Sequence, residues 1–119
     1  MEKRTLTITI DAEWQDALRN AARIGFSAKR YRGETLNFET PGAFFSRLTS
    51  RRWAVLDALM GEGEVPVREL ARRLKRDVKR VHEDATELVN LGLVERTPAG
   101  RLTCPYADIH MDMHMRRAA

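Results

Sequence analysis

The sequence lacks the features that mark several large classes of protein. A single cysteine, Cys104, stands among 119 residues, which excludes an intrachain disulfide and a metal site made of cysteines alone. No apolar run approaches the roughly 18 residues that a membrane span needs, so we expect no membrane-spanning helix. The first ten residues contain no long apolar segment and no small-residue cleavage site. We therefore expect no secretory signal and a cytoplasmic location.

Catalytic motifs are missing as well. The sequence has no glycine-rich phosphate loop, no recognisable Ser/His/Asp or Cys/His set, and no paired carboxylates in a readable motif. We therefore expect that the protein is not an enzyme and uses no cofactor. Hydrophobic residues make up 43% of the chain and charged residues 32%, a composition that supports one packed domain with at most a small appendage.

Basic residues are in modest excess, with 21 Lys and Arg against 17 Asp and Glu, and only four of the basic residues are lysines. Arginine is favoured where planar, two-pronged contacts to phosphate or guanine are made. The excess is concentrated between Pro66 and Arg80, where seven basic residues accompany two acidic ones. This distribution, more than the total, indicates an anionic partner.

The first 48 residues are predicted to form a strand–helix–strand extension. Residues 5–10 alternate threonine with leucine or isoleucine, which is typical of a strand buried on one face. A helix capped by its first residue is expected over 11–24, and a second short strand over 34–40. Pro41 then begins a short helix. Its expected apolar residues are Phe44, Phe45 and Leu48.

Three amphipathic helices are expected next, over residues 50–60, 67–74 and 78–91. The three-residue break Lys75-Arg76-Asp77 separates the second from the third, with its aspartate as the cap of the third helix. Gly92 ends that helix. The apolar stripes consist of Trp53, Val55, Leu56, Leu59 and Met60, then Val67, Leu70, Ala71 and Leu74, then Val78, Val81, Ala85, Leu88 and Val89.

The C-terminal part is predicted to be β-structure. Residues 93–97 and 101–104 flank the turn Pro98-Ala99-Gly100 and are expected to form a hairpin. Residues 109–115 alternate apolar residues with His and Asp, which predicts a last strand. The methionines of this strand are expected in the core or in an interface, and Cys104 is expected to pack as a small apolar residue near the sheet.

Helix, helix, three-residue turn, helix and β-hairpin is the element order of a winged helix-turn-helix domain. We therefore predict an α+β fold with two parts. Residues 1–48 form the strand–helix–strand extension, for dimerisation or contact with a partner. Residues 49–119 form a winged helix-turn-helix DNA-binding domain with a C-terminal strand. In such a domain the third helix enters the major groove and the hairpin contacts the adjacent backbone or minor groove.

The basic residues of the third helix carry the functional prediction. Lys79 and Arg80 lie in its first turn, where the helix dipole disfavours cations by roughly 0.3–1 kcal/mol each. Phosphate or guanine would offset that cost, although a basic face can also be solvated surface or a protein contact. The residues predicted to contact DNA are Arg76, Lys79, Arg80, His82 and Glu83 in the major groove, Arg68 on phosphate, and Arg96 and Arg101 in the wing.

Three of these interpretations have open alternatives. Glu83 either accepts from a cytosine amino group or is an ordinary exposed acid, and His82 either touches the DNA backbone or packs. His110, Asp112 and His114 share a strand face, as metal ligands can, but one strand brings three side chains together only loosely. We expect no metal there and interpret them as polar residues of an edge or dimer strand.

Five stretches carry a resemblance to a known family. They are Leu48-Thr-Ser-Arg-Arg-Trp53, Val67-Arg-Glu-Leu-Ala-Arg-Arg-Leu74, Arg76-Asp-Val-Lys-Arg-Val-His-Glu-Asp84, Leu91-Gly-Leu-Val-Glu-Arg96 and Cys104-Pro-Tyr-Ala-Asp-Ile-His110. With them, residues 49–115 resemble small prokaryotic winged-helix regulators related to the MarR-type transcription factors. The resemblance implies the antitoxin and autoregulator half of a toxin–antitoxin pair. The sequence departs from the group at Pro66, where such helices often carry a Ser or Thr cap.

The sequence thus predicts a cytoplasmic, dimeric, sequence-specific DNA-binding repressor, and the resemblance implies that it represses its own gene and acts as an antitoxin. Its expected partners are double-stranded operator DNA, a second copy of the chain and a cognate toxin protein, but no membrane. The strands over 5–10 and 109–115 are expected to form a dimer interface or an edge that a partner strand extends. The alternative is a protein-interaction module that neutralises a toxin with little DNA binding. A regulator that responds to a small molecule would need an effector pocket that the sequence does not locate.

Overall fold

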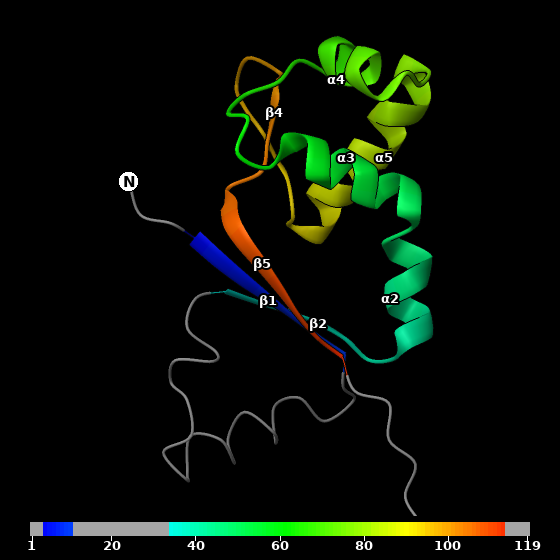
Figure 1. Cartoon of the computed structure of the whole chain (residues 1–119), viewed down its shortest axis with the longest axis vertical. Coiled ribbons are helices and arrows are strands. Elements are labelled where there is room, and N and C mark those ends of the chain that lie inside the picture. Colours follow the sequence, from blue (N-terminus) through cyan, green and yellow to red (C-terminus); the bar gives the residue numbers. More distant parts are fainter. Residues whose placement is uncertain (1–3, 11–33, 114–119) are drawn as a thin grey trace, which may run out of the picture. The chain divides into compact units, whose positions relative to one another are not determined.

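The computed structural model describes residues 4–10 and 34–113 (Figure 1). They form a mixed α/β protein with short helices and strands. The elements are β1 (Arg4–Ile10), β2 (Glu34–Phe38), α2 (Pro41–Arg47), α3 (Ser50–Leu59), α4 (Val67–Leu74), α5 (Val78–Leu91), β3 (Glu95–Arg96), β4 (Leu102–Thr103) and β5 (Tyr106–Met113). The helix predicted over 11–24 lies outside the described residues, as do His114 and Met115. No helix among the described residues is long and apolar enough to cross a membrane.

The described residues divide into two compact units. The first contains residues 4–10, 34–46 and 108–113, and the second contains residues 47–107. The second unit therefore begins close to the predicted boundary after residue 48, while most of β5 belongs to the first unit. The roles predicted for the two parts of the chain stay predictions.

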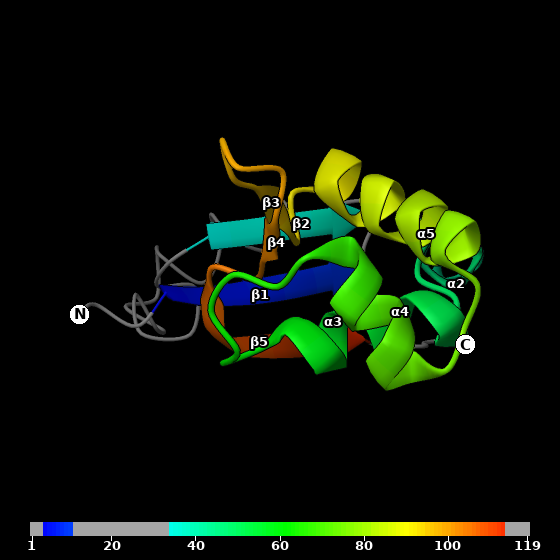
Figure 2. The ribbon, with the colours of Figure 1, turned by 90° about the horizontal axis from the view of Figure 1, so that it is seen from above.

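The first unit contains most of α2 and a three-stranded sheet with the order β2-β1-β5 (Figure 2). β1 and β2 are parallel, with Leu6 opposite Glu34 and Ile10 opposite Phe38. Both strands were predicted, β1 from the alternation of its residues, and both are confirmed. β2 ends at Phe38, and Thr40 instead caps α2, because its Oγ1 accepts a hydrogen bond from the N–H of Ala43 at 3.1 Å.

One prediction about side-chain direction in this unit is wrong. Thr7 and Thr9 are only 2% and 6% exposed, so β1 is buried on both faces and not on one. β1 is the central strand, and the Thr9 hydroxyl is satisfied by donating to Asn37 Oδ1 at 2.8 Å. Phe45 is 58% exposed, whereas its neighbour Phe44 is buried. Adjacent helical residues point about 100° apart, so one face cannot bury both.

Helices α3, α4 and α5 form the second unit with the β3–β4 hairpin. The core consists of Val55, Leu56 and Leu59 from α3, Leu70 and Ala71 from α4, Val81, Ala85 and Leu88 from α5, and Val65, Leu93, Val94 and Leu102 around the hairpin. The predicted stripes are confirmed in their centres. Val78 departs from its stripe, because it is the first residue of α5 and lies 41% exposed at the helix end.

The helix ends of this unit follow their local sequence. Asp77 caps α5, because its Oδ2 accepts from the N–H of Arg80 at 3.2 Å, as predicted. Pro66 gives α4 no side-chain cap, also as predicted. Gly92 ends α5 with a φ of 83°, a left-handed conformation that glycine adopts without a steric penalty. Lys75 adopts the same conformation at the end of α4, with a φ of 54°.

The predicted hairpin forms, with Glu95 opposite Thr103 and Arg96 opposite Leu102. Its turn is closed by a 2.8 Å hydrogen bond from the N–H of Gly100 to the carbonyl of Thr97. Val65, in the segment before α4, exchanges two hydrogen bonds with Leu102, at 2.8 and 2.9 Å. The sequence did not indicate this bridge, because a single paired residue leaves no periodic pattern.

The last predicted strand is also present, but it begins at Tyr106 and not at Ile109. Two of its methionines are largely exposed, Met111 at 47% and Met113 at 41%. The prediction that these two methionines lie in the core is therefore wrong. Their position in an interface stays a prediction. Cys104 is buried, as expected of a small apolar residue.

Candidate nucleic-acid interface

The first two turns of α5 present a charged surface to solvent. Lys79, Arg80, His82 and Glu83 all have exposed side chains, while Val81 between them is buried. The hydrogen bond from the Arg80 amide to Asp77 fixes where this helix begins. The carboxylate at the cap stabilises the positive end of the helix, and the two cations follow directly behind it. No acidic residue lies in the first turn of α5 itself.

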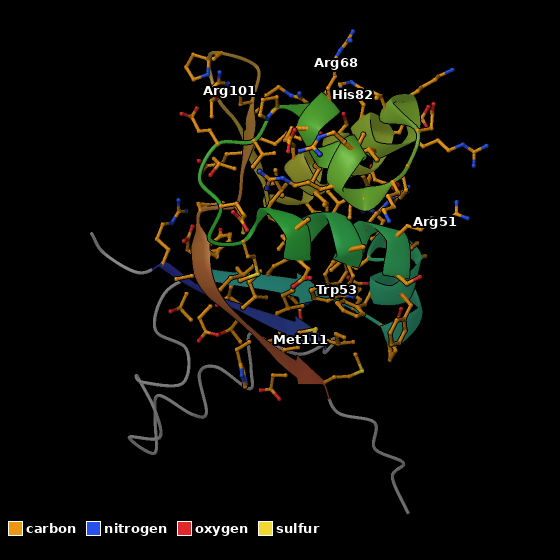
Figure 3. All side chains as sticks on the ribbon, turned by 45° about the horizontal axis from the view of Figure 1, so that its top comes forward. Arg51, Trp53, Arg68, His82, Arg101 and Met111 are labelled. Carbon is orange, nitrogen blue, oxygen red and sulfur yellow. The ribbon has the colours of Figure 1, made fainter. Side chains whose placement is uncertain are left out.

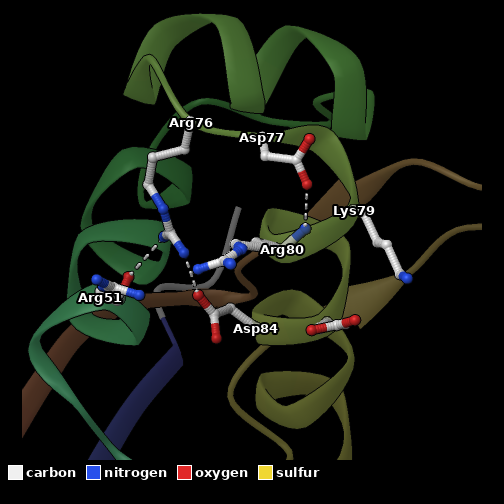
Figure 4. Close-up of a pocket in the computed structure, with 7 residues that line it drawn as sticks. Arg51, Arg76, Asp77, Lys79, Arg80 and Asp84 are labelled. Carbon is white, nitrogen blue, oxygen red and sulfur yellow. Dashed lines mark hydrogen bonds and ion pairs between the residues drawn. The ribbon is translucent and has the colours of Figure 1, made fainter.

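A hollow of about 470 Å³ lies beside these residues (Figure 4). It brings together the start of α3, the turn between α4 and α5, and the exposed face of α5. Its lining residues are Arg51, Arg76, Asp77, Lys79, Arg80, Glu83 and Asp84. All seven are charged, and they belong to three segments of the chain. Such a hollow suits a polar or anionic group better than an apolar ligand.

One acid in the lining of this hollow, Asp84, binds two arginines. Asp84 Oδ2 lies 2.6 Å from Arg76 Nη2, and Asp84 Oδ1 lies 3.3 Å from Arg52 Nε. The three side chains are only 15%, 20% and 24% exposed, in the order Asp84, Arg76, Arg52. Arg76 also donates from Nη1 to the carbonyl oxygen of Arg51 at 3.4 Å. The structure therefore places Arg76, predicted to lie in the major groove, in a contact that joins the α4–α5 turn to α3 and α5.

Other arginines of the basic segment are also neutralised within the chain. Glu69 accepts two hydrogen bonds from Arg72, one from Nη2 and one from Nε at 3.0 Å. It accepts a third from Arg73 Nε at 3.1 Å. The Arg72 hydrogen bond, followed by that from Arg73, holds the pKa of Glu69 below its usual value and in turn raises the pKa of Arg72. Arg47 pairs with Glu87 at 2.6 Å.

Seven basic side chains of residues 47–107 form no ion pair among the described residues. They are Arg51, Arg68, Lys75, Lys79, Arg80, Arg96 and Arg101. Five of them were predicted to contact DNA. Arg51 and Lys75 were not, although Arg51 is exposed and stands in the run Ser50-Arg-Arg-Trp53, whose second arginine turns inward to Asp84. The run alone does not show which of its two arginines points toward Asp84 and which points to solvent.

The remaining predicted residues lie on α4 and the hairpin. Arg68 extends away from the start of α4, and Arg101 stands at the hairpin turn (Figure 3). Arg96 on β3 donates from Nη2 to the hydroxyl of Thr86 at 3.5 Å, a long contact that leaves its guanidinium exposed. Of the residues predicted to contact DNA, the structure therefore brings Arg76, Lys79, Arg80 and Glu83 together around one hollow, and Arg68, His82, Arg96 and Arg101 are not part of its lining.

Residues 47–111 match a family described as HVO_A0114. The match covers more than half of the chain. The chain belongs to the HVO_A0114 family. Comparisons with curated proteins and with solved structures found no match.

The part of the chain that matches the HVO_A0114 family contains the whole candidate interface. It extends from Arg47 through α3, α4, α5 and the hairpin to Met111 in β5. The strands β1 and β2 lie outside it. Among the described residues, no group of three or more His, Cys, Asp or Glu side chains is placed to hold a metal ion.

Proposed function

We propose that the protein is a sequence-specific, double-stranded DNA-binding regulator of transcription with a winged helix-turn-helix domain. In this proposal α3, α4 and α5 are the three helices and the β3–β4 hairpin is the wing. The observation that carries it is the pair Lys79 and Arg80, two exposed cations in the first turn of α5 with no acidic partner in the described part of the chain. Their position costs helix stability, and a phosphate or a guanine edge would compensate for it.

In this proposal each exposed side chain has a role. Lys79 and Arg80 contact phosphate or guanine, and Glu83 accepts from a cytosine amino group. His82 contacts the backbone. Arg51 joins this set from α3 and contacts a phosphate beside the hollow. Arg68 contacts a phosphate next to α4, while Arg96 and Arg101 contact the backbone from the wing. Arg76 acts as a positioning residue, because its guanidinium is bound to Asp84.

Salt dependence of binding tests this assignment. The double variant Lys79→Ala/Arg80→Ala is expected to bind DNA more weakly and to lose about two units of the slope of log K against log salt, since each phosphate contact contributes about 0.9. The matched control is Arg72→Ala, which removes a cation that Glu69 already neutralises. The assay is fluorescence anisotropy with a labelled duplex taken from upstream of the protein's own gene. Equal slopes for the double variant and the control would refute the assignment.

We infer the antitoxin role from the resemblance alone, as a second function on a different surface. Toxin neutralisation would not use Lys79 and Arg80. The double variant is therefore expected to lose DNA affinity and to keep toxin binding in a co-purification assay. A protein-interaction module with little DNA binding of its own would instead show the same weak DNA affinity before and after the substitution.

A further inference from the structure

The outer edge of β5 has no strand beside it in the described part of the chain. Its one hydrogen-bonded neighbour there is β1, and an unpaired edge of this kind is a template for another strand. Ile109, Met111 and Met113 point to one face of β5, and Asp108, His110 and Asp112 point to the other. Met111 and Met113 are largely exposed, and Figure 3 shows Met111 at the sheet surface.

Two copies of β5 that run antiparallel place matching side chains opposite each other. With Met111 at the centre of an antiparallel pair, each Met111 lies opposite the other. Ile109 then lies opposite Met113, so that apolar side chains meet on one face. On the other face His110 lies opposite Asp112, a base opposite an acid. Directly opposite residues on neighbouring strands are the ones that interact, and opposite-charge pairs stabilise the pairing.

The two registers that differ from this one by a single residue lose the match. Centring the pair on His110 sets Asp108 opposite Asp112, and centring it on Asp112 sets that carboxylate opposite its own copy. Like charges directly opposite each other destabilise a sheet. Centring on Ile109 keeps an acid opposite a base, Asp108 opposite His110, but it sets Tyr106 opposite Asp112. The Tyr106 side chain is buried, and its hydroxyl donates to the Gly92 carbonyl at 3.4 Å. That register also draws in Pro105, which has no N–H to donate.

We propose that β5 pairs with β5 of a second copy of this chain, antiparallel, with the two-fold axis at Met111. The pairing joins two three-stranded sheets into one continuous sheet and covers the exposed methionines. A second copy is favoured over an unrelated strand, because a two-fold axis presents the same Ile/Met and His/Asp pattern twice. The proposal does not rest on DNA binding, since the pairing is measured in the absence of DNA.

Disulfide trapping tests the register. Residues directly opposite in an antiparallel pair have Cα atoms roughly 4.5–5.5 Å apart, which is within disulfide reach. The full-length Met111→Cys variant is therefore expected to form a covalent dimer on mild oxidation. Ile109→Cys is the matched control, because its two copies would be offset by four residues, about 13 Å along the strands. Ile109→Cys mixed with Met113→Cys is expected to cross-link.

The wild type, oxidised in parallel, controls for the buried Cys104. A protein that sediments as a monomer and yields no Met111→Cys dimer would overturn the proposal. Cross-linking of Ile109→Cys alone, as efficient as that of Met111→Cys, would overturn the register.

Charge variants of His110 and Asp112 provide a second test. His110→Asp places an acid opposite Asp112, and Asp112→Lys places a lysine opposite His110. Each variant alone is expected to dimerise about tenfold more weakly than the wild type, as measured by sedimentation velocity. Their equimolar mixture is expected to recover the association, because the introduced aspartate of one copy then faces the introduced lysine of the other. Circular dichroism confirms that each variant is folded. Failure of the mixture to associate better than either variant would overturn the pairing.

Discussion

Asp84→Asn is expected to destabilise residues 47–107. The carboxylate joins Arg52 of α3 and Arg76 of the α4–α5 turn to α5, at 3.3 and 2.6 Å. The substitution keeps the size of the side chain but removes its charge and one of its acceptor oxygens. Both arginines then lose their acidic partner in positions where they are less than one quarter exposed.

The size of the effect follows from that exposure. Hydrogen bonds to charged groups contribute about 1.5–3 kcal/mol each, and breaking a fully buried ion pair costs about 3–5 kcal/mol. Both arginines retain some access to water and rehydrate in part. We therefore expect a loss of about 2 kcal/mol in the free energy of unfolding, between the values of exposed and of fully buried pairs.

Urea unfolding followed by circular dichroism measures this loss. With a slope near 1 kcal/mol per M for a small domain, the midpoint is expected to fall by about 2 M. The matched control is Glu69→Gln, which also breaks contacts with two arginines, but with more exposed partners on one helix. A midpoint for Asp84→Asn equal to that of the control would refute the reasoning, because burial would then make no difference to the ion pairs.

Two further predictions concern single positions in the same unit. Gly92→Ala is expected to destabilise the protein by about 1 kcal/mol, because a φ of 83° strains a residue that has a Cβ. The added Cβ would meet no atom within 4 Å, so the cost comes from the backbone conformation alone. An unchanged thermal midpoint would contradict this prediction. Burial raises the pKa of the Cys104 thiol, so the folded state keeps its proton and stability should fall as the pH rises above the thiol's unfolded pKa of about 8.5. Cys104 should accordingly react slowly with a thiol reagent at pH 8 and rapidly in urea, and equal rates would contradict its burial.

Most of the second unit could be predicted from local sequence signals. The Asp77 cap, the end of α5 at Gly92 and the hairpin turn each depend on a few consecutive residues. The features that were not predicted from the sequence depend on residues that are distant along the chain. Thr9 is buried because of where β1 lies in its sheet, and Val65 pairs with a strand that follows it by more than thirty residues.

In the candidate interface, too, features set by local sequence could be predicted and features set by distant residues could not. The exposed face of α5 follows from helical periodicity, so the exposure of Lys79, Arg80 and Glu83 could be predicted. Arg76 belongs to the same basic run, but Asp84, eight residues later, binds it. Arg51 was missed for the converse reason, since its neighbour Arg52 reaches that same acid and leaves Arg51 at the hollow. A charge count along the chain does not separate neutralised arginines from available ones.

DNA binding by the wild-type protein tests the central proposal most directly. Affinity would be measured for the duplex upstream of the protein's own gene and for a shuffled duplex of equal length and composition, over a series of salt concentrations. The proposal predicts a clear preference for the natural duplex and an affinity that falls steeply as salt rises. Absence of binding even at low salt, or equal affinity for the two duplexes, would contradict a sequence-specific regulator.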